Sequence, residues 1–134
     1  MIDAATRRLV CERAGNRCEY CGMLQAQQSF PAFHIDHIIA QQHGGTDDPA
    51  NLALSCYHCN LHKGTNLTGI DPQTGAVEAL FHPRRDAWTA HFARHEAVIL
   101  GLTATGRTTV RVLNMNAADR VQLRTTLQDE RRLH

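Results

Sequence analysis

Apolar and polar positions alternate over some stretches of the chain and recur at helical spacing over others, which predicts a mixed α+β fold. The stretch Phe33-His34-Ile35-Asp36 alternates with the period of a strand. Trp88 and Phe92 stand four positions apart, the spacing of two side chains on one helix face. The whole pattern predicts helices over 3–14, 57–63, 86–95, 105–113 and 117–133, strands over 33–36, 51–55, 77–81 and 97–102, loops or turns over 16–32, 40–50 and 69–75, and helix caps at Asp3, Thr105 and Asn116.

The character of the sequence changes after Pro83, which divides the chain into residues 1–83 and residues 84–134. The first part holds the motifs described below, whereas the second is rich in arginine and is predicted to be mainly helical. A chain of 134 residues suits one domain, or one small domain with an appendage. We expect the extension to pack on the first part through Trp88 and Phe92, so that the two parts form one compact unit.

The composition allows only a modest core, since 43% of the residues are apolar and 5% are aromatic. Small domains of this kind often need a bound metal for stability. No apolar run approaches the roughly 18 residues of a membrane span, and the first ten residues do not resemble a signal peptide. We therefore expect no membrane partner and a cytoplasmic location, where cysteines stay reduced.

Charge is distributed unevenly, although the formal net charge is only +1. Residues 1–83 carry five basic and eight acidic side chains, a balance of −3, and residues 84–134 carry nine and five, a balance of +4. Thirteen of the fourteen basic residues are arginine, which is suited to bidentate contact with phosphate. Ordinary solvated ion pairs are the competing interpretation of these arginines.

The five cysteines include two Cys-x-x-Cys pairs, which indicate a metal site. Four thiolates are the ligand set of a closed, tetrahedral, structural zinc site, which leaves no position open for water. A disulfide pair and a redox dithiol are the alternatives. The predicted ligands are Cys18, Cys21, Cys56 and Cys59. Cys11 stands apart, and we interpret it as a small buried apolar residue.

Between and after these pairs stand Asp36-His37, Gly44-Gly45, Asn51-Leu52 and Asn60, the last directly following Cys59. With these motifs, residues 8–66 resemble the HNH endonucleases. The resemblance implies a ββα-metal core, a β-hairpin and a helix around one catalytic metal, here stapled by zinc. The fold class we expect is therefore α+β, a small zinc-stapled ββα core with an added helical C-terminal part.

The resemblance also implies a role for each motif residue. His37 falls at the first histidine, the general base, and a histidine suits this role because its pKa lies near working pH. Asp36 falls at the adjacent ligand position, where a carboxylate suits Mg²⁺ or Mn²⁺. Asn51 braces the loop and orients the histidine. Asn60 replaces the usual last histidine, as in HNN variants, and still offers an oxygen to the metal.

Other residues are candidate contacts with substrate or metal. Lys63, three positions after Asn60, could neutralise phosphate, and Arg120 and Arg124, which share a helix face, are predicted to hold the DNA backbone. His34 shares a strand face with Asp36, and His62 lies roughly 200° around the helix from Asn60. Whether either histidine joins the site stays open.

These observations predict an endonuclease that hydrolyses DNA phosphodiester bonds with one divalent metal and His37 as base. By analogy with the family, the products carry 5′-phosphate and 3′-hydroxyl ends. One alternative is a non-catalytic zinc-ribbon module that binds nucleic acid. Another is a redox-sensing zinc protein with Cys11 as its reactive thiol. A cleavage assay with Mg²⁺ or Mn²⁺ separates the first hypothesis from the second, and zinc release under mild oxidant would mark the third.

Overall fold

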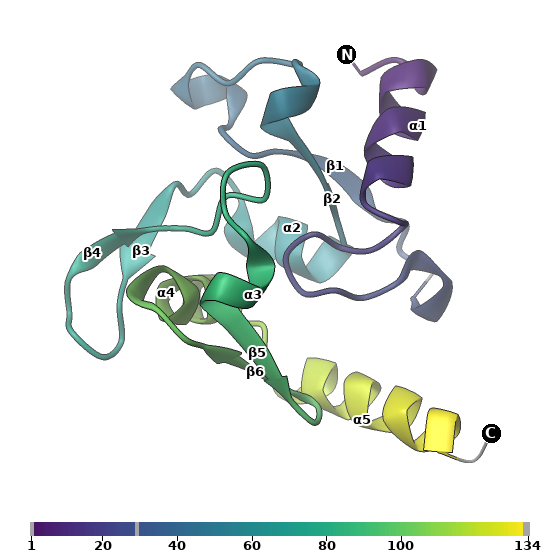
Figure 1. Cartoon of the computed structure of the whole chain (residues 1–134). Helices are drawn as coiled ribbons and strands as arrows, with labels where there is room; N and C mark the ends of the chain where they lie inside the picture. Colours follow the sequence, from purple (N-terminus) through teal and green to yellow (C-terminus); the bar gives the residue numbers. More distant parts are fainter. Residues whose placement is uncertain (1, 29, 133–134) are drawn as a thin grey trace.

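The chain forms short helices and paired strands in the order labelled in Figure 1. The computed structural model describes residues 2–28 and 30–132. The elements of this part of the chain are α1 (Ala4–Arg13), η1 (Gln25–Gln27), β1 (His34–His37), η2 (Gln41–His43), η3 (Pro49–Asn51), β2 (Leu52–Ser55), α2 (Tyr57–Lys63), β3 (Thr68–Ile70), β4 (Val77–Ala79), α3 (Trp88–His91), β5 (Phe92–His95), β6 (Val98–Gly101), α4 (Ala104–Val112) and α5 (Ala118–Arg132).

A ββα unit lies at the centre of the functional region. Strands β1 and β2 pair antiparallel with Asp36 opposite Ala53, and α2 follows β2 and contacts β1. Every residue of β2 is buried, in keeping with its apolar sequence. Helix α1 begins where the Asp3 carboxylate accepts a hydrogen bond from the backbone N–H of Thr6 at 2.8 Å. It packs against β2.

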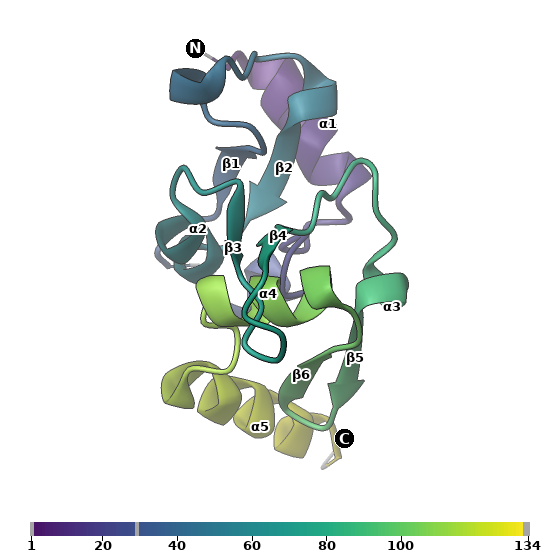
Figure 2. The same ribbon diagram turned by 90° about the vertical axis from the view of Figure 1, so that its left-hand side faces the viewer.

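The elements that follow α2 lie toward the end of the molecule opposite to α1 (Figure 2). Helix α4 packs against β3, β4 and β6. Figure 2 shows the hairpin β1–β2 and α1 at one end of the molecule, α5 at the other end, and α4 with β3 and β4 between them. Strands β3 and β4 form one antiparallel pair, and β5 and β6 form another.

The helix predicted over 86–95 is wrong. Helix α3 ends at His91, and the backbone becomes extended at Phe92, with φ −137° and ψ 156°, where β5 begins. Phe92 then pairs with Gly101 of β6. The rings of Trp88 and Phe92 still contact one another, with centroids 5.1 Å apart. Burial of Phe92 and strand pairing therefore outweigh the local helical spacing.

Three smaller expectations also change. The turn predicted from residue 69 begins later, because residues 68–70 belong to β3. The cap of α4 is Thr103, not Thr105, and its hydroxyl accepts from the N–H of Gly106 at 3.0 Å. Asn116 was expected to cap the last helix, but α5 begins at Ala118. The Asn116 side chain exchanges two hydrogen bonds with the backbone of Ile99. The predicted end of the last helix at residue 133 lies outside the described residues.

One cluster of buried apolar side chains contains residues from both parts of the chain, including Val10, Leu54, Phe92, Leu113 and Met115. The expected fold class is confirmed as a small α+β domain with a ββα unit, a four-cysteine cluster and C-terminal helices. The division into residues 1–83 and 84–134 stays a prediction. Among the described residues no helix is both long and apolar enough to cross a bilayer.

Candidate active site and cysteine cluster

The four cysteines of the two Cys-x-x-Cys pairs meet in a closed cluster. All four are buried, and their sulfur atoms lie within 4.8 Å of one another. Both pairs adopt the same turn, since the N–H of Cys21 donates to Cys18 Sγ at 3.5 Å and the N–H of Cys59 donates to Cys56 Sγ at 3.4 Å. The cysteines are free thiols. Four convergent sulfur ligands without an open position fit a structural zinc ion.

The cluster offers four convergent sulfur atoms to a cation. Burial raises the pKa of the Cys18 thiol, so that this group would stay protonated without a positive charge beside it. Cys56 is at the same time the N-cap of α2. A zinc ion bound here would thus fix the start of the helix that carries Asn60.

Arg120 and Arg124 were predicted to hold the DNA backbone, and that prediction is wrong for both side chains. Each is only 3% exposed. Arg120 donates to Cys56 Sγ at 3.7 Å and to the Gln28 side chain at 2.7 Å. Arg124 donates to the carbonyl oxygens of Ala97 at 2.6 Å and Met115 at 2.7 Å. The two do share a helix face, but this face packs inward beside the thiols.

A zinc-loaded cluster would give a physical reason for this burial. A zinc ion with four thiolates would carry a net charge of −2, and a buried charge needs a partner. Arg120 contacts the cluster directly, and Arg124 lies close enough for Cys21 and Cys59 to favour its charged form, although burial lowers its pKa. Two guanidinium groups from α5 therefore oppose the charge of the site.

On the other side of α2 lies an open cavity of about 430 Å³. Its lining comes from β1, from the loop that follows β1, and from the end of α2. Asp36, His37 and Asn60 all contribute to it. The structure thus brings three of the four predicted catalytic residues to one pocket. The side-chain oxygens of Asp36 and Asn60 suit a hard divalent cation, and the imidazole of His37 suits a general base beside it.

Asp36 is buried at the edge of this cavity and is held by two partners. The Tyr20 hydroxyl donates to its Oδ2 at 2.6 Å, and the Lys63 ammonium lies 3.3 Å from Oδ1 and 3.2 Å from Oδ2. Burial raises the pKa of Asp36, and the charge of Lys63 and the bond from Tyr20 oppose this shift. Ionised oxygens keep lone pairs for a metal beyond these bonds.

Lys63 consequently has a different place from the one predicted. Its side chain is 2% exposed, and its ammonium also donates to the carbonyl oxygen of His37 at 3.2 Å. The predicted direct contact between Lys63 and phosphate is therefore wrong, because the buried ammonium donates its hydrogen bonds to Asp36 and to the backbone of β1. Tyr20 was missed by the sequence analysis, since nothing local marks a tyrosine between two cysteines as a partner of Asp36.

His37 bonds to a residue that the sequence analysis also missed. Its Nε2 lies 2.7 Å from Oδ1 of Asp47, and the side chains of His37 and Asp47 are 25% and 41% exposed. The bond from His37 lowers the pKa of Asp47. The only signal in the sequence was an acidic residue shortly after Gly44-Gly45, which is common in loops.

Asn51 braces the loop, as the resemblance implied. Its Oδ1 accepts from the N–H of Ile39 at 2.9 Å, and its Nδ2 donates to the carbonyl oxygens of Ile39 at 3.0 Å and Thr46 at 2.9 Å. The bonds that the structure shows for Asn51 go to backbone atoms, whereas the ring of His37 bonds to Asp47. The expected orientation of the histidine by Asn51 is therefore indirect.

The comparison with protein families agrees with this geometry. Residues 18–66 match the model of a family described as HNH endonuclease. Residues 18–66 are an HNH endonuclease domain. The domain contains all four cysteines of the cluster and the three pocket residues Asp36, His37 and Asn60. No curated protein and no solved structure gave a match to the chain.

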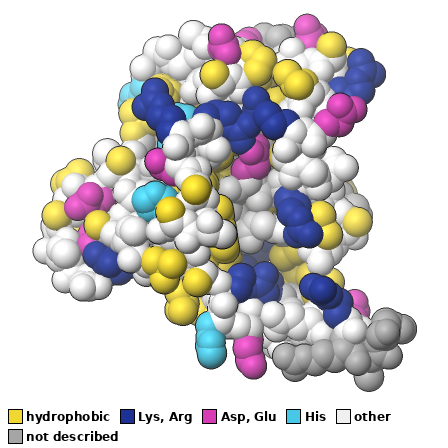
Figure 3. Space-filling model, viewed as in Figure 1, with side chains coloured by type: hydrophobic (Ala, Val, Ile, Leu, Met, Phe, Trp, Pro, Cys, Tyr) yellow, Lys and Arg dark blue, Asp and Glu magenta, His cyan; other side chains and the backbone are white. Residues whose placement is uncertain are grey.

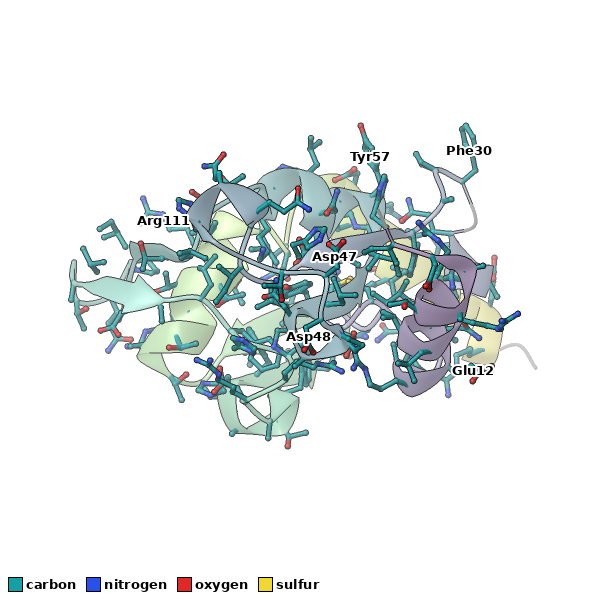
Figure 4. All side chains as sticks on the ribbon, turned by 90° about the horizontal axis from the view of Figure 1, so that it is seen from above. Glu12, Phe30, Asp47, Asp48, Tyr57 and Arg111 are labelled. Carbon is teal, nitrogen blue, oxygen red and sulfur yellow. The ribbon has the colours of Figure 1, made fainter. Side chains whose placement is uncertain are left out.

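Two further histidines of the HNH domain lie outside the lining described for the open cavity. His34 is exposed, and its ring lies 6.0 Å from that of Tyr57. His62 bonds to the carbonyl oxygen of His58 at 2.9 Å, and the two rings are 4.2 Å apart. Tyr57 projects outward from the domain in Figure 4.

Proposed function

We propose that the protein hydrolyses DNA phosphodiester bonds at the open cavity of its HNH domain. The observation that carries this proposal is the convergence of Asp36, His37 and Asn60 on one solvent-open pocket. The buried cysteine cluster, by contrast, has no open ligand position and suits a structural ion. In this proposal the structural metal and the catalytic metal bind at separate places in the fold.

Each residue of the pocket has a defined task in this proposal. Asp36 and Asn60 supply oxygen ligands to one Mg²⁺ or Mn²⁺ ion. When bound, this ion would neutralise charge on the phosphate and stabilise the leaving 3′ oxygen. His37 accepts a proton from the attacking water. Lys63 and Tyr20 hold the Asp36 carboxylate in place.

DNA contacts are then expected at exposed arginines rather than at Arg120 and Arg124. Arg17, Arg94 and Arg131 are exposed, and together they line a cavity of about 500 Å³ beside the first cysteine pair. Figure 3 shows Lys and Arg side chains at several places on the same view of the molecule as Figure 1. Such contacts would supply affinity that depends on salt and carries no sequence information.

Plasmid cleavage in Mg²⁺ or Mn²⁺ tests the proposal, scored for nicked and linear products. We expect nicked plasmid first, because the described residues form one pocket that contains Asp36, His37 and Asn60. His37→Ala should lose roughly 10²–10⁴ in single-turnover rate, since base catalysis is typically worth that factor. The variant should keep its zinc, its melting temperature and its affinity for DNA.

Two further variants make the assay specific. Asp36→Ala should lose activity, and the remainder should need more divalent metal, because an oxygen ligand is gone. His34→Ala is the control, since its ring packs on Tyr57 and lies outside the lining of the cavity. Near-parental cleavage by His37→Ala would refute the mechanism.

One observation favours the alternative, a non-catalytic module that binds nucleic acid. Asp36 is buried and already held by Tyr20 and Lys63, as a structural carboxylate would be. DNA binding without cleavage in either metal would support this second function over the first.

A further inference from the structure

The loop between β1 and β2 brings the side chain of Asp47 next to His37, the proposed general base. Oδ1 of Asp47 lies 2.7 Å from Nε2 of His37. An ionised carboxylate can only accept a hydrogen bond, so Nε2 carries a proton and donates it. In the neutral ring the remaining nitrogen, Nδ1, then holds the lone pair. The pair therefore selects one tautomer of His37.

Specific residues make the loop tight enough for this contact. A Cβ at Gly45 would overlap the carbonyl oxygen of Ile39, and Gly44 has φ +89°, a conformation that favours glycine. Asn51 ties the two ends of the loop, because it bonds both Ile39 and the carbonyl oxygen of Thr46. Thr46 directly precedes Asp47. The Gly-Gly and Asn motifs thus place Asp47 beside His37.

We propose that Asp47 is a positioning residue for His37, an inference that rests on the proposed function. Asp47 holds the ring in the Nε2–H tautomer, so that Nδ1 is the nitrogen that takes the proton from water. The water O–H bond breaks, its proton moves to Nδ1, and its oxygen forms the new bond to phosphorus as the bond to the 3′ oxygen breaks. The leaving oxygen takes a proton from solvent, and the imidazolium later releases its own.

Asp47 contributes in two ways to this step. It keeps the accepting nitrogen constant, and its negative charge stabilises the imidazolium that forms. Asn51 acts on His37 indirectly, because it holds the backbone of the loop that carries Asp47. A partly exposed ion pair adds little to folding stability. Replacement of Asp47 should therefore change the chemistry far more than the melting temperature.

The neighbouring residue Asp48 provides a matched control. Its carboxylate accepts from the N–H of Ala50 at 2.9 Å and caps η3, a task that asparagine also performs. Figure 4 shows Asp47 and Asp48 at separate places on the face seen from above. Asp47→Asn and Asp48→Asn remove the same charge one position apart, but only the first removes it from His37.

The first measurement is the tautomer of His37, independent of activity. Long-range ¹H–¹⁵N spectra, recorded under conditions where the ring is neutral, report which ring nitrogen carries the proton. The His37 signal is assigned by its absence in His37→Ala. We expect the Nε2–H form in the parent and in Asp48→Asn, and a mixture with the Nδ1–H form in Asp47→Asn. An unchanged tautomer in Asp47→Asn would overturn the inference.

The second measurement is single-turnover cleavage at saturating DNA, with DNA affinity measured separately. Asp47→Asn should cut about 10–100-fold more slowly, by analogy with the effect of removing the carboxylate partner of a metal-bound histidine, with unchanged affinity. Asp47→Glu keeps the charge and should recover part of the rate. A loss of affinity without a loss of rate would make Asp47 a DNA contact and overturn the inference. If the parent protein does not cut, the proposed function fails, and the tautomer measurement still decides whether Asp47 positions the ring.

Discussion

Helix α2 has a closed side and an open side, and the comparison of the two explains how a small domain combines stability with chemistry. Cys59 is buried in the cysteine cluster, whereas the next residue, Asn60, lines the open cavity. Consecutive helix residues point about 100° apart, so one turn of helix is enough to serve both sites. A metal that holds the closed side also holds the open side in register.

The two sides use buried cations from different sources. On the open side, Lys63 comes from α2 itself and pairs with Asp36. On the closed side, Arg120 comes from α5, 64 positions along the chain from Cys56. The open side uses residues from Tyr20 to Lys63, whereas the closed side also recruits Arg120 from α5. Changes on α5 should therefore lower the affinity for zinc, and they should leave catalysis unchanged as long as zinc stays bound.

Removal of zinc is expected to have the largest effect, because it should disrupt both the cysteine cluster on the closed side of α2 and the cavity on the open side. Structural zinc sites contribute on the order of 10 kcal/mol to folding in small domains. Cys56→Ser removes a ligand and also the sulfur cap of α2. We expect loss of zinc by metal analysis and loss of the cooperative thermal transition, as with a strong chelator.

Cys11→Ser is the matched control for this variant, since Cys11 is a free thiol outside the cluster. It should keep its zinc and nearly all of its thermal stability. Should Cys56→Ser retain both zinc content and melting temperature, the cluster would have no structural role.

Arg120→Met sharpens the comparison, because it should weaken the closed side alone. Residues that bond to metal ligands typically contribute about 10–100-fold to metal affinity. We expect zinc to be lost to a competing chelator more readily by that factor. The salt dependence of DNA binding should stay as in the parent, since the guanidinium is buried.

The exposed residue Arg17 is the matched control for Arg120. If Arg17 contacts phosphate, Arg17→Met should lower the salt slope by about 1 and leave zinc retention unchanged. The reverse result, a lower slope for Arg120→Met with zinc retention intact, would restore the original interpretation of Arg120 as a DNA contact.

The closed side could be predicted from the sequence and much of its surroundings could not. Two Cys-x-x-Cys pairs predict a four-sulfur cluster because spacing within each pair sets the turn. The spacing of Arg120 and Arg124 correctly placed them on one face, but helical periodicity does not say whether a charged face meets water or thiols. Only tertiary packing decides that.

The open side shows the same limit. Asp36, His37 and Asn60 were predicted from the motif. Tyr20 lies 16 positions from its partner Asp36, and Asp47 lies 10 positions from its partner His37. No local sequence pattern marks either of these two residues. Phe92 illustrates the opposite case. Its spacing from Trp88 predicted that both lie on one helix face, and the two rings do contact one another, but the backbone between them is only partly helical because Phe92 pairs in a strand.

The smallest effect is expected from loss of the ion pair between Asp71 and Arg107, which belongs neither to the cysteine cluster nor to the open cavity. Arg107 donates from Nε and Nη2 to the two carboxylate oxygens at 3.0 and 2.8 Å, and this holds the pKa of Asp71 far below its usual range. A lowered pKa means that the pair stabilises the fold above the unfolded-state pKa of about 3.9, and that this contribution is lost as pH falls below it.

Asp71→Asn isolates this charge, because an asparagine oxygen can still accept from Gln73 as Asp71 does. We expect a melting temperature lower by roughly 4 °C at pH 7, and a difference from the parent that shrinks as the pH falls from about 4. Arg107→Gln should show the same pH dependence, and the double variant should be little worse than either single one, because both remove the same pair. Zinc retention and the tautomer of His37 should not change in any of the three. A loss of zinc in Asp71→Asn would show that the two sides of α2 depend on the whole fold rather than on the contacts assigned to each.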